Sequence, residues 1–253
     1  MHVRALGRFP VKSMQGETLR QLTVTDVAVE GDRAFGVYDV AAGTVVSAKR
    51  DGRLLEASAR WLDGDVVVAV PGLGEYPRGK ALDEQLSQWL GRPLRLVDAR
   101  SFGVATFESP AEFDDPDSAI ETWESPGYSF VDDSALHVVT TGDLEVLRGE
   151  RPDLQWDVRR FRPNVVVEGA ESAAWLRPGV RVALGGAEIV VERGCSRCVM
   201  TTRSQPGALE RQLDVLRQVV GYHGGDVGVR ARVVRAGTVE LDDPVEIVED
   251  SER

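Results

Sequence analysis

Two cysteines, spaced as Cys195-Ser196-Arg197-Cys198, are the residues of this sequence with the widest chemical range. A thiolate attacks electrophiles and binds soft metals, and nearby positive charge lowers the pKa of a thiol. Arg193, Arg197 and Arg203 flank the pair. The pair, taken alone, leaves three interpretations open: a metal ligand, a reactive thiol, and two partly buried structural cysteines.

Neither a thioredoxin-like redox pair nor a zinc site fits this C-x-x-C pair well. A thioredoxin-like pair opens a helix in a β-α-β unit, whereas here the chain runs through residues 199–202 into Pro206-Gly207, which is a poor helix start. A zinc site needs four ligands, and no histidine is spaced beside the pair. His137, in a predicted strand, and His223, in a glycine-rich loop, are interpreted as structural.

A second cluster, Arg159-Arg160-Phe161-Arg162-Pro163-Asn164, leads into a short apolar run. Pro163 disfavours helix at Arg162 and fixes an extended or turn geometry there. A stiffly held arginine suits bidentate binding of a phosphate or carboxylate, and Asn164 adds a donor and an acceptor. The alternative interpretation is a surface arginine cluster that balances an acidic segment by charge.

A third cluster pairs Phe9-Pro10-Val11-Lys12-Ser13-Met14 with Gly31-Asp32-Arg33-Ala34-Phe35. It offers one amine, one hydroxyl and one guanidinium next to turns. By itself this pattern is typical of surface residues.

Composition bounds the elements that must position these residues. The chain has 253 residues, 42% hydrophobic and 28% charged, which is typical of a globular protein and excludes a disordered or disulfide-framework class. The net charge of −11 belongs to one segment: between Arg100 and Arg148 there are 11 acids and no lysine or arginine. This acidity argues against nucleic acid as a partner.

The sequence predicts no membrane partner either, because no apolar run approaches the roughly 20 residues that span a bilayer. The first residues lack the apolar core of a signal peptide. We therefore expect a cytoplasmic protein.

Periodicity predicts many short strands and few helices. Apolar residues at helical spacing predict helices over 82–90, 142–148 (with Thr141 as N-cap) and 209–220. Residues 101–133, rich in proline and acid, are predicted to be a linker or surface loop. This pattern favours a β-barrel or mixed α+β architecture. Strands are predicted over 22–29, 34–39, 44–48, 61–70, 92–98, 136–139, 165–167, 180–184, 187–192, 227–234 and 245–248.

The clusters occur together, in this order, in one family. The chain resembles MOSC-domain proteins, the molybdenum cofactor sulfurase C-terminal domain family, in the form with an N-terminal β-barrel. The resemblance covers nearly the whole chain, through Pro10–Ser13, Gly31–Phe35, Phe161–Asn164, Cys195–Cys198 with Thr201-Thr202, and the closing segments 237–239 and 243–245.

The resemblance implies a mainly β (α+β) fold. An N-terminal β-barrel-like domain (1–100) would pack on a MOSC β-barrel domain (134–253) with a few short helices, and 101–133 would be the acidic linker or loop between them.

In relatives of the amidoxime-reducing type, a cysteine thiolate binds molybdenum while charged and polar side chains hold the pterin. The resemblance therefore gives Cys198 the roles of metal ligand and catalytic residue, with Asp132 or Asp133 as a further contact. A phosphate ester with a soft metal needs such cations and such a thiolate. The positions that match the set holding the molybdenum cofactor (molybdopterin) are Lys12, Ser13, Arg33, Arg162, Asn164 and Ser196.

The activity implied is two-electron reduction of a small N-oxygenated substrate, with Arg197, Arg203 and residues 108–133 bordering the entrance. Two cysteines cannot hold the two-iron ferredoxin cluster of some relatives, so electrons would come from a separate donor protein. Arg203 departs from the family's Thr-Thr-x-Asp-Pro run.

Two other functions stay open at this point. One is a sulfur carrier or cofactor-delivery module that uses a Cys198 persulfide, and the other is a fold used only for partner binding. Some members carry a pyridoxal phosphate label, but neither Lys49 nor Lys80 lies in a recognisable site for that group.

Overall fold

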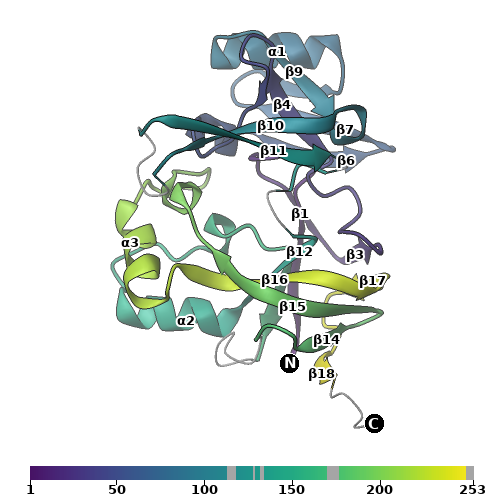
Figure 1. The fold of residues 1–253 in the computed structure, drawn as a ribbon, viewed down its shortest axis with the longest axis vertical. Helices are drawn as coiled ribbons and strands as arrows, with labels where there is room; N and C mark the ends of the chain where they lie inside the picture. The colour runs from purple at the N-terminus through teal and green to yellow at the C-terminus, as the bar shows by residue number, and fades with distance from the viewer. Residues whose placement is uncertain (113–117, 128, 132–133, 170–176, 249–253) are drawn as a thin grey trace.

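The structure, a computed structural model, describes residues 1–112, 118–127, 129–131, 134–169 and 177–248. It is mainly β, as predicted. Figure 1 shows the N-terminal sheets with the first helix at one end, and a curled sheet with the other two helices at the opposite end. The helices of the described part are α1 (Lys80–Leu90), α2 (Thr141–Glu150) and α3 (Leu213–Tyr222).

The curled sheet has eight strands in the order β18-β14-β15-β16-β12-β13-β1-β2. Val, Ile and Leu on its inner face form one hydrophobic cluster. The strands are β1 (His2–Arg8), β2 (Glu17–Leu19), β12 (Leu136–Thr140), β13 (Val165–Glu168), β14 (Arg181–Leu184), β15 (Ala187–Ser196), β16 (Asp226–Arg235) and β18 (Val245–Val248).

Three smaller sheets complete the fold, in the orders β11-β10-β5-β4-β9, β6-β7-β8 and β17-β3. A second hydrophobic cluster lies beneath α1. Their strands are β3 (Gln21–Val24), β4 (Phe35–Asp39), β5 (Thr44–Val45), β6 (Ser58–Leu62), β7 (Asp65–Val70), β8 (Gly74–Pro77), β9 (Leu94–Asp98), β10 (Gly103–Pro110), β11 (Ile120–Gly127) and β17 (Gly237–Glu240).

The start of the chain belongs to the C-terminal sheet. β1 pairs antiparallel with both β13 and β2, and β3 pairs with β17 near the other end of the chain. A boundary at residue 100 therefore does not separate the sheets, and the domain boundaries stay a prediction.

The predicted linker or loop over 101–133 is wrong for most of its described residues, which form a β-hairpin. β10 and β11 pair from Gly103–Gly127 to Pro110–Ile120. Ala105 and Phe107 alternate into a cluster of their own. The acidic and proline residues elsewhere in this segment hid the period of two. Residues 113–117, 128 and 132–133 of that prediction lie outside the described residues.

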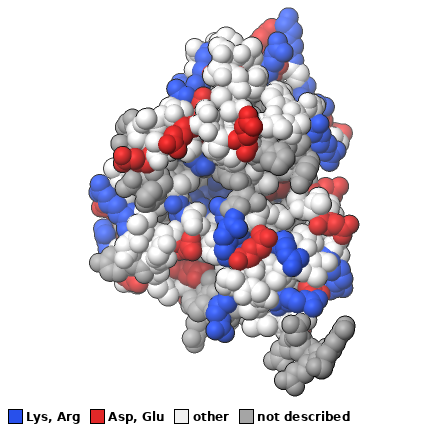
Figure 2. Space-filling model, viewed as in Figure 1, with Lys and Arg blue, Asp and Glu red and all other residues white. Residues whose placement is uncertain are grey.

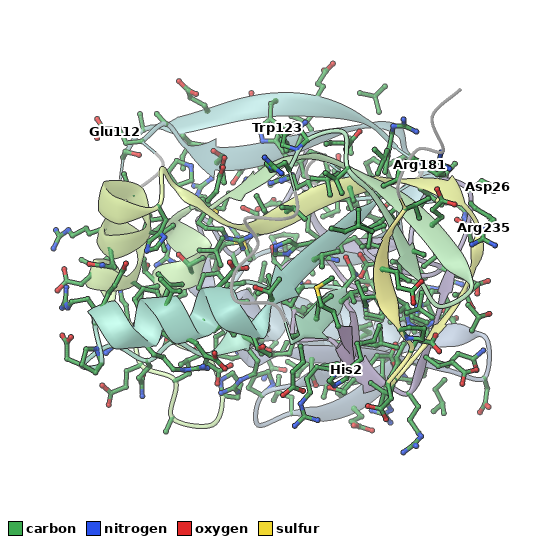
Figure 3. All side chains as sticks on the ribbon, turned by 90° about the horizontal axis from the view of Figure 1, so that it is seen from below. His2, Asp26, Glu112, Trp123, Arg181 and Arg235 are labelled. Carbon is green, nitrogen blue, oxygen red and sulfur yellow. The ribbon has the colours of Figure 1, made fainter. Side chains whose placement is uncertain are left out.

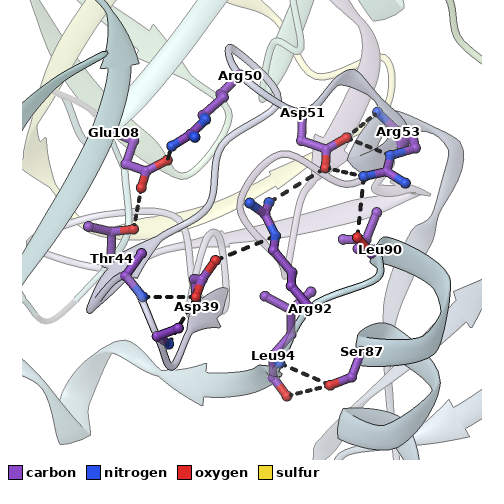
Figure 4. A network of polar contacts seen from close by, with 12 residues as sticks. Asp39, Thr44, Arg50, Asp51, Arg53, Ser87, Leu90, Arg92, Leu94 and Glu108 are labelled. Atoms are coloured by element: carbon purple, nitrogen blue, oxygen red, sulfur yellow. Dashed lines mark hydrogen bonds and ion pairs between the residues drawn. The ribbon is translucent and has the colours of Figure 1, made fainter.

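One acid of this segment is part of the interior. The carboxylate of Glu108 is buried, pairs with Arg50, and accepts a hydrogen bond from Thr44 Oγ1 at 2.7 Å (Figure 4). Other charges lie at the margins: Figure 3 shows Glu112 near one edge of the molecule, and Arg181 and Arg235 at the opposite edge. At least one acidic side chain of the hairpin, that of Glu108, is thus buried and paired instead of exposed to solvent.

The predicted helices are present, with shifted beginnings. α1 ends at Gly91, whose φ of 73° suits glycine. α3 begins at Leu213, because Leu209 pairs with Gln205 instead of opening the helix. No helix in the described ranges is long and apolar enough to cross a membrane.

The N-cap of α2 is Thr140 rather than Thr141. Thr140 Oγ1 accepts from the backbone N of Asp143 at 3.0 Å, and the Asp143 carboxylate accepts from the N of Thr140 at 3.2 Å. This reciprocal capping satisfies two backbone donors that the helix itself leaves unpaired.

We expect Thr140→Ala to lower the free energy of unfolding by about 1 kcal/mol, because the N-terminal turn of α2 loses its cap. Urea denaturation followed by circular dichroism measures this loss. Thr140→Ser keeps the hydroxyl and serves as the control, and Thr141→Ala should cost less than Thr140→Ala. The reverse order would assign the cap to Thr141.

Candidate functional site

One cavity lies between the N-terminal sheets and the eight-stranded sheet. Figure 2 shows this face hollowed, with lysine or arginine atoms inside the hollow. The structure brings all seven sequence-predicted site residues to its lining, although their roles in binding stay a prediction. They are Lys12 and Ser13 after β1, Arg33 before β4, Arg162 and Asn164 before β13, and Ser196 and Cys198 at the end of β15.

Three of these residues have strained backbones. Ser13, Arg33 and Arg162 have φ values of 68°, 47° and 54°, and they are three of the six described non-glycine residues with positive φ. L-residues adopt this region at a cost of about 1 kcal/mol or more, so surrounding contacts must hold it. Ser13 Oγ accepts from Ala48 N at 2.9 Å, and Arg33 N donates to Phe9 O at 2.7 Å. Such strain concentrated around one cavity is typical of a binding site.

Phe9 is a residue that the sequence analysis missed. Its ring centroid lies 4.6 Å from Cζ of Arg33 and 4.2 Å from Cζ of Arg162. Each guanidinium is attracted to the ring, so Phe9 supports two like charges in one place. The only sequence signal was an aromatic residue beside Pro10.

Lys12 is held in the same way. Its side chain is buried, Nζ donates to the carbonyl of Phe130 at 3.0 Å, and Nζ lies 4.5 Å from the Phe107 ring centroid. Phe107 belongs to β10 of the β10–β11 hairpin, and Phe130 follows shortly after β11. The hairpin therefore helps to build the cavity.

Asn164 braces the floor of the cavity. Its Nδ2 donates to Gly7 O in β1 at 3.2 Å, and its Oδ1 accepts from His137 N in β12 at 3.2 Å. The side chain is 2% exposed. Asn164 thus connects two strands and uses one donor and one acceptor of its side chain on backbone.

The two cysteines have different surroundings. Cys195 is buried and Cys198 is partly exposed, and both are free thiols. Arg197 Nη1 lies 2.7 Å from Cys195 Sγ, while its Nη2 donates to Phe161 O at 3.0 Å. Burial alone would raise the pKa of Cys195, but the positive charges of His137 and Arg197, with a smaller contribution from Arg230, lower it to about 5.

His137 lines this cavity, which the structural interpretation from sequence did not foresee. Its Nε2 lies 3.4 Å from Val227 O and 3.5 Å from Arg197 Nη1. Gly228, with φ of 71°, permits this close packing, because a Cβ there would lie 2.4 Å from Val138 O and 3.0 Å from the imidazole.

The predicted border of the entrance is partly wrong. Arg197 lines the cavity, but Arg203 does not. Arg203 reaches across to the N-terminal half and donates to Lys49 O at 2.7 Å. Of residues 108–133, only Phe130 and Val131 are among the described lining residues, and Asp132 and Asp133 lie outside the described residues.

The lysines weighed for pyridoxal phosphate lie elsewhere. Lys49 Nζ is 5.8 Å from the Trp123 ring centroid, and Lys80 pairs with Glu84 on the exposed side of α1. Neither is a lining residue of this cavity.

The lysines and arginines outnumber the acids among the described lining residues of the cavity. No acidic side chain is found among these residues, whereas six are lysine or arginine: Lys12, Arg33, Arg160, Arg162, Arg197 and Arg230. Arg197 Nε is buried and has no hydrogen-bond partner among the described residues. These donors fit an anionic ligand with oxygen acceptors.

A metal here would need donors from the ligand itself. Within the described ranges, no group of three or more His, Cys, Asp or Glu side chains could hold a metal ion. A single thiolate suits a soft metal whose other ligands arrive with it. The residues present therefore fit an anionic cofactor that carries its own metal.

The fold and the cavity define a mainly β protein with a basic cavity that contains a thiol. Residues 1–91 match the MOSC N-terminal beta barrel domain, and residues 126–246 match the MOSC domain. The chain belongs to the MOSC-domain proteins with an N-terminal MOSC β-barrel domain. This family is linked to the molybdenum cofactor, and some of its members are molybdenum-dependent reductases.

Two solved structures are similar to this chain, and the first shares its fold. The YuaD protein from Bacillus subtilis is 12% identical, with 97% of this chain and 94% of that chain covered and a TM-score of 0.50. YiiM from Escherichia coli is 21% identical, with 50% of this chain and 60% of that chain covered and a TM-score of 0.37. A comparison with curated proteins found no match.

We expect Asn164→Ala to lower the free energy of unfolding by about 1–3 kcal/mol, because Gly7 O and His137 N lose their partner in a buried place. Ser196→Ala, which removes an exposed hydroxyl bonded to Asp226, should change it by about 0.5 kcal/mol or less. Chemical denaturation measures both. Equal losses in the two variants would contradict the role of Asn164 as a brace.

Proposed function

We propose that this protein binds the molybdenum cofactor (molybdopterin) in the cavity and reduces small N-oxygenated compounds with electrons from a separate donor protein. The observation that carries the proposal is the meeting of one partly exposed thiol, Cys198, with six basic side chains in a cavity without acidic residues in its described lining.

The cationic residues divide between recognition and support. Arg33, which also pairs with Asp32, and Arg162 both contact the Phe9 ring and suit the phosphate of the cofactor. Lys12 and the hydroxyl of Ser13 would bind polar atoms of the pterin beside it. The absence of acidic lining residues in the described part favours an anion of more than one charge.

Cys198 would be the metal ligand. It precedes the 3-10 helix η5 (Val199–Thr202), and its carbonyl accepts from Thr201 N at 3.0 Å and from Thr201 Oγ1 at 2.9 Å. Thr201 and Thr202 are both buried. The Thr-Thr pair of the motif thus fixes the backbone from which the thiol points.

The bound cofactor would supply two-electron redox chemistry. An N-hydroxylated substrate takes up two electrons and two protons and gives the N–H compound and water. The chain's own residues would bind the anion and hold Cys198 in place. A separate donor protein supplies the electrons.

A second candidate function follows from the state of Cys198, which is a free and partly exposed thiol. Such a thiol can carry a persulfide, as a sulfur carrier or cofactor-delivery module would require. Molybdenum and pterin at near one equivalent favour the reductase, whereas cyanide-releasable sulfur without metal favours the carrier.

We expect protein purified from a host that makes the cofactor to contain molybdenum and pterin, and Cys198→Ser to lose most of the molybdenum because a hydroxyl is a poor ligand for a soft metal. Metal analysis and fluorescence of the oxidised pterin measure both. Lys80→Ala, on the exposed side of α1, is the control. Unchanged molybdenum in Cys198→Ser would overturn the ligand assignment.

We expect Phe9→Leu to weaken pterin retention about tenfold, since each guanidinium loses an attraction of roughly 0.5–2 kcal/mol to the ring. Equilibrium dialysis of the loaded protein measures the retained pterin. Trp89→Leu removes an aromatic ring that packs on the N-terminal core and controls for general destabilisation. Equal retention in the two variants would show that Phe9 does not support the arginines.

A further inference from the structure

Cys195 lies where three adjacent strands bring positive charge together. His137 of β12 is the register partner of Arg230 of β16, and β16 pairs in turn with β15, which carries Cys195. Arg197 follows β15 and approaches the sulfur to 2.7 Å. His137, Arg197 and Arg230 therefore place positive charge near the sulfur from three separate segments of the chain.

These cations favour the charged form of the thiol. Although burial disfavours the charged form, His137, Arg197 and Arg230 bring the pKa of Cys195 to about 5. Arg193 is the register partner of Arg230 and adds to the same positive region. The carboxylate of Asp226, also on β16, accepts a hydrogen bond from Ser196 Oγ at 2.8 Å.

Ionisation alone does not make a nucleophile. Cys195 is 4% exposed and its sulfur is engaged by Arg197, so an electrophile has little access to it. Cys198 is partly exposed. The two thiols of the motif thus differ in charge and in access. Cys195 favours the charged form but is buried, whereas Cys198 is accessible.

Arg197 connects the charged thiol to the accessible one. Besides contacting Cys195 Sγ, its Nη2 donates to Phe161 O at 3.0 Å, and its backbone N donates to Gly225 O at 2.8 Å. Arg197 immediately precedes Cys198. A shift of this arginine would move the chain that carries Cys198.

We propose that Cys195 is a positioning residue: its sulfur is an internal counter-ion that holds Arg197, and Arg197 fixes the segment that presents Cys198. The counter-ion role concerns the protein without cofactor, and only its importance for ligand binding rests on the proposed function.

The first experiment titrates the thiolate by its ultraviolet absorbance in protein made without pterin. Cys198→Ser leaves Cys195 as the sole cysteine, and we expect a midpoint near 5. Cys198→Ser with Arg197→Met should shift this midpoint upward by about one pH unit or more, because a neighbouring positive charge is lost. A midpoint in the ordinary range of about 8.5 would overturn the proposal.

The second experiment uses Cys198 as a reporter. Iodoacetamide at neutral pH, with peptide mass spectrometry, should alkylate Cys198 at least about tenfold faster than Cys195, since access outweighs ionisation. Cys195→Ser, which removes the anion, should change the Cys198 rate several-fold. Cys195→Asp should return the rate toward that of the wild type, because a carboxylate again pairs with Arg197.

Two results would overturn the positioning role: faster alkylation of Cys195, which would make it the nucleophile, or an unchanged Cys198 rate in Cys195→Ser. Circular dichroism and melting curves establish that each variant is folded. A variant that does not fold is replaced by Arg197→Met, which removes the same contact from the other side and should change the Cys198 rate in the same sense.

Stability gives an independent readout with a defined sign. The pKa of Cys195 is lower in the folded chain than in an unfolded one, so its contribution is complete above about 8.5 and is lost as the pH falls through about 5. The melting temperature of the wild type minus that of Cys195→Ser should therefore increase as the pH rises from 5 to 8.5. A constant difference would contradict the thiolate.

These readouts separate the two proposals. If the titration and alkylation behave as expected while the protein retains no molybdenum or pterin, the proposed function fails and the role of Cys195 stands. If molybdenum is retained while Cys195 titrates as an ordinary thiol, the reverse holds.

Discussion

The pairing of β1 with β13 is the interaction on which the site depends. Gly7 N donates to Asn164 O at 2.9 Å, and Asn164 Nδ2 donates back to Gly7 O at 3.2 Å. This contact joins residues 157 positions apart in the sequence. Because β1 is fixed there, the connection that follows it places Lys12 and Ser13 against the turn that carries Arg162. The N-terminal sheets and the eight-stranded sheet thus meet at the cavity.

A buried collection of like charges is unfavourable unless each charge has a partner. The cavity supplies partners of several kinds: the Asp32 carboxylate and the Phe9 ring for Arg33, the same ring and the Met14 carbonyl for Arg162, a carbonyl and a ring for Lys12, and the Cys195 sulfur for Arg197. A ring or a carbonyl attracts a cation without cancelling its charge, so these contacts are compatible with an anionic ligand in the cavity.

The sequence predicted those parts of the structure that depend on local pattern. Leu82, Leu86 and Leu90 marked α1, and Gly91 marked its end. The β10–β11 hairpin was missed because the apolar alternation of Ala105 and Phe107 stops at Ser109, and because the position after Phe107 holds a buried acid, Glu108. The burial of the Glu108 carboxylate is explained by its ion pair with Arg50, which lies 58 residues away in the sequence.

The same distinction applies to the site. The seven predicted residues came from short motifs whose order matched a family, and the structure brings them to one cavity. Phe9, His137 and Arg230 were not predicted as site residues, because their places depend on turn geometry and on the register of β12 against β16. Arg203 was placed wrongly for a related reason: adjacency to the motif does not say that its side chain crosses to Lys49.

The strand that carries the C-x-x-C motif explains why it differs from a redox pair at a helix. In β15 the first cysteine is buried near His137 of β12 and Arg230 of β16, and the second lies beyond the strand, before η5. Arginines keep their charge across the physiological pH range. The charges of His137 and Arg197 lower the pKa of the inward sulfur, without a contribution from a helix dipole. The motif then separates charge from access, which a cavity needs if one thiol is to meet a ligand while its neighbour keeps the surrounding arginines in place.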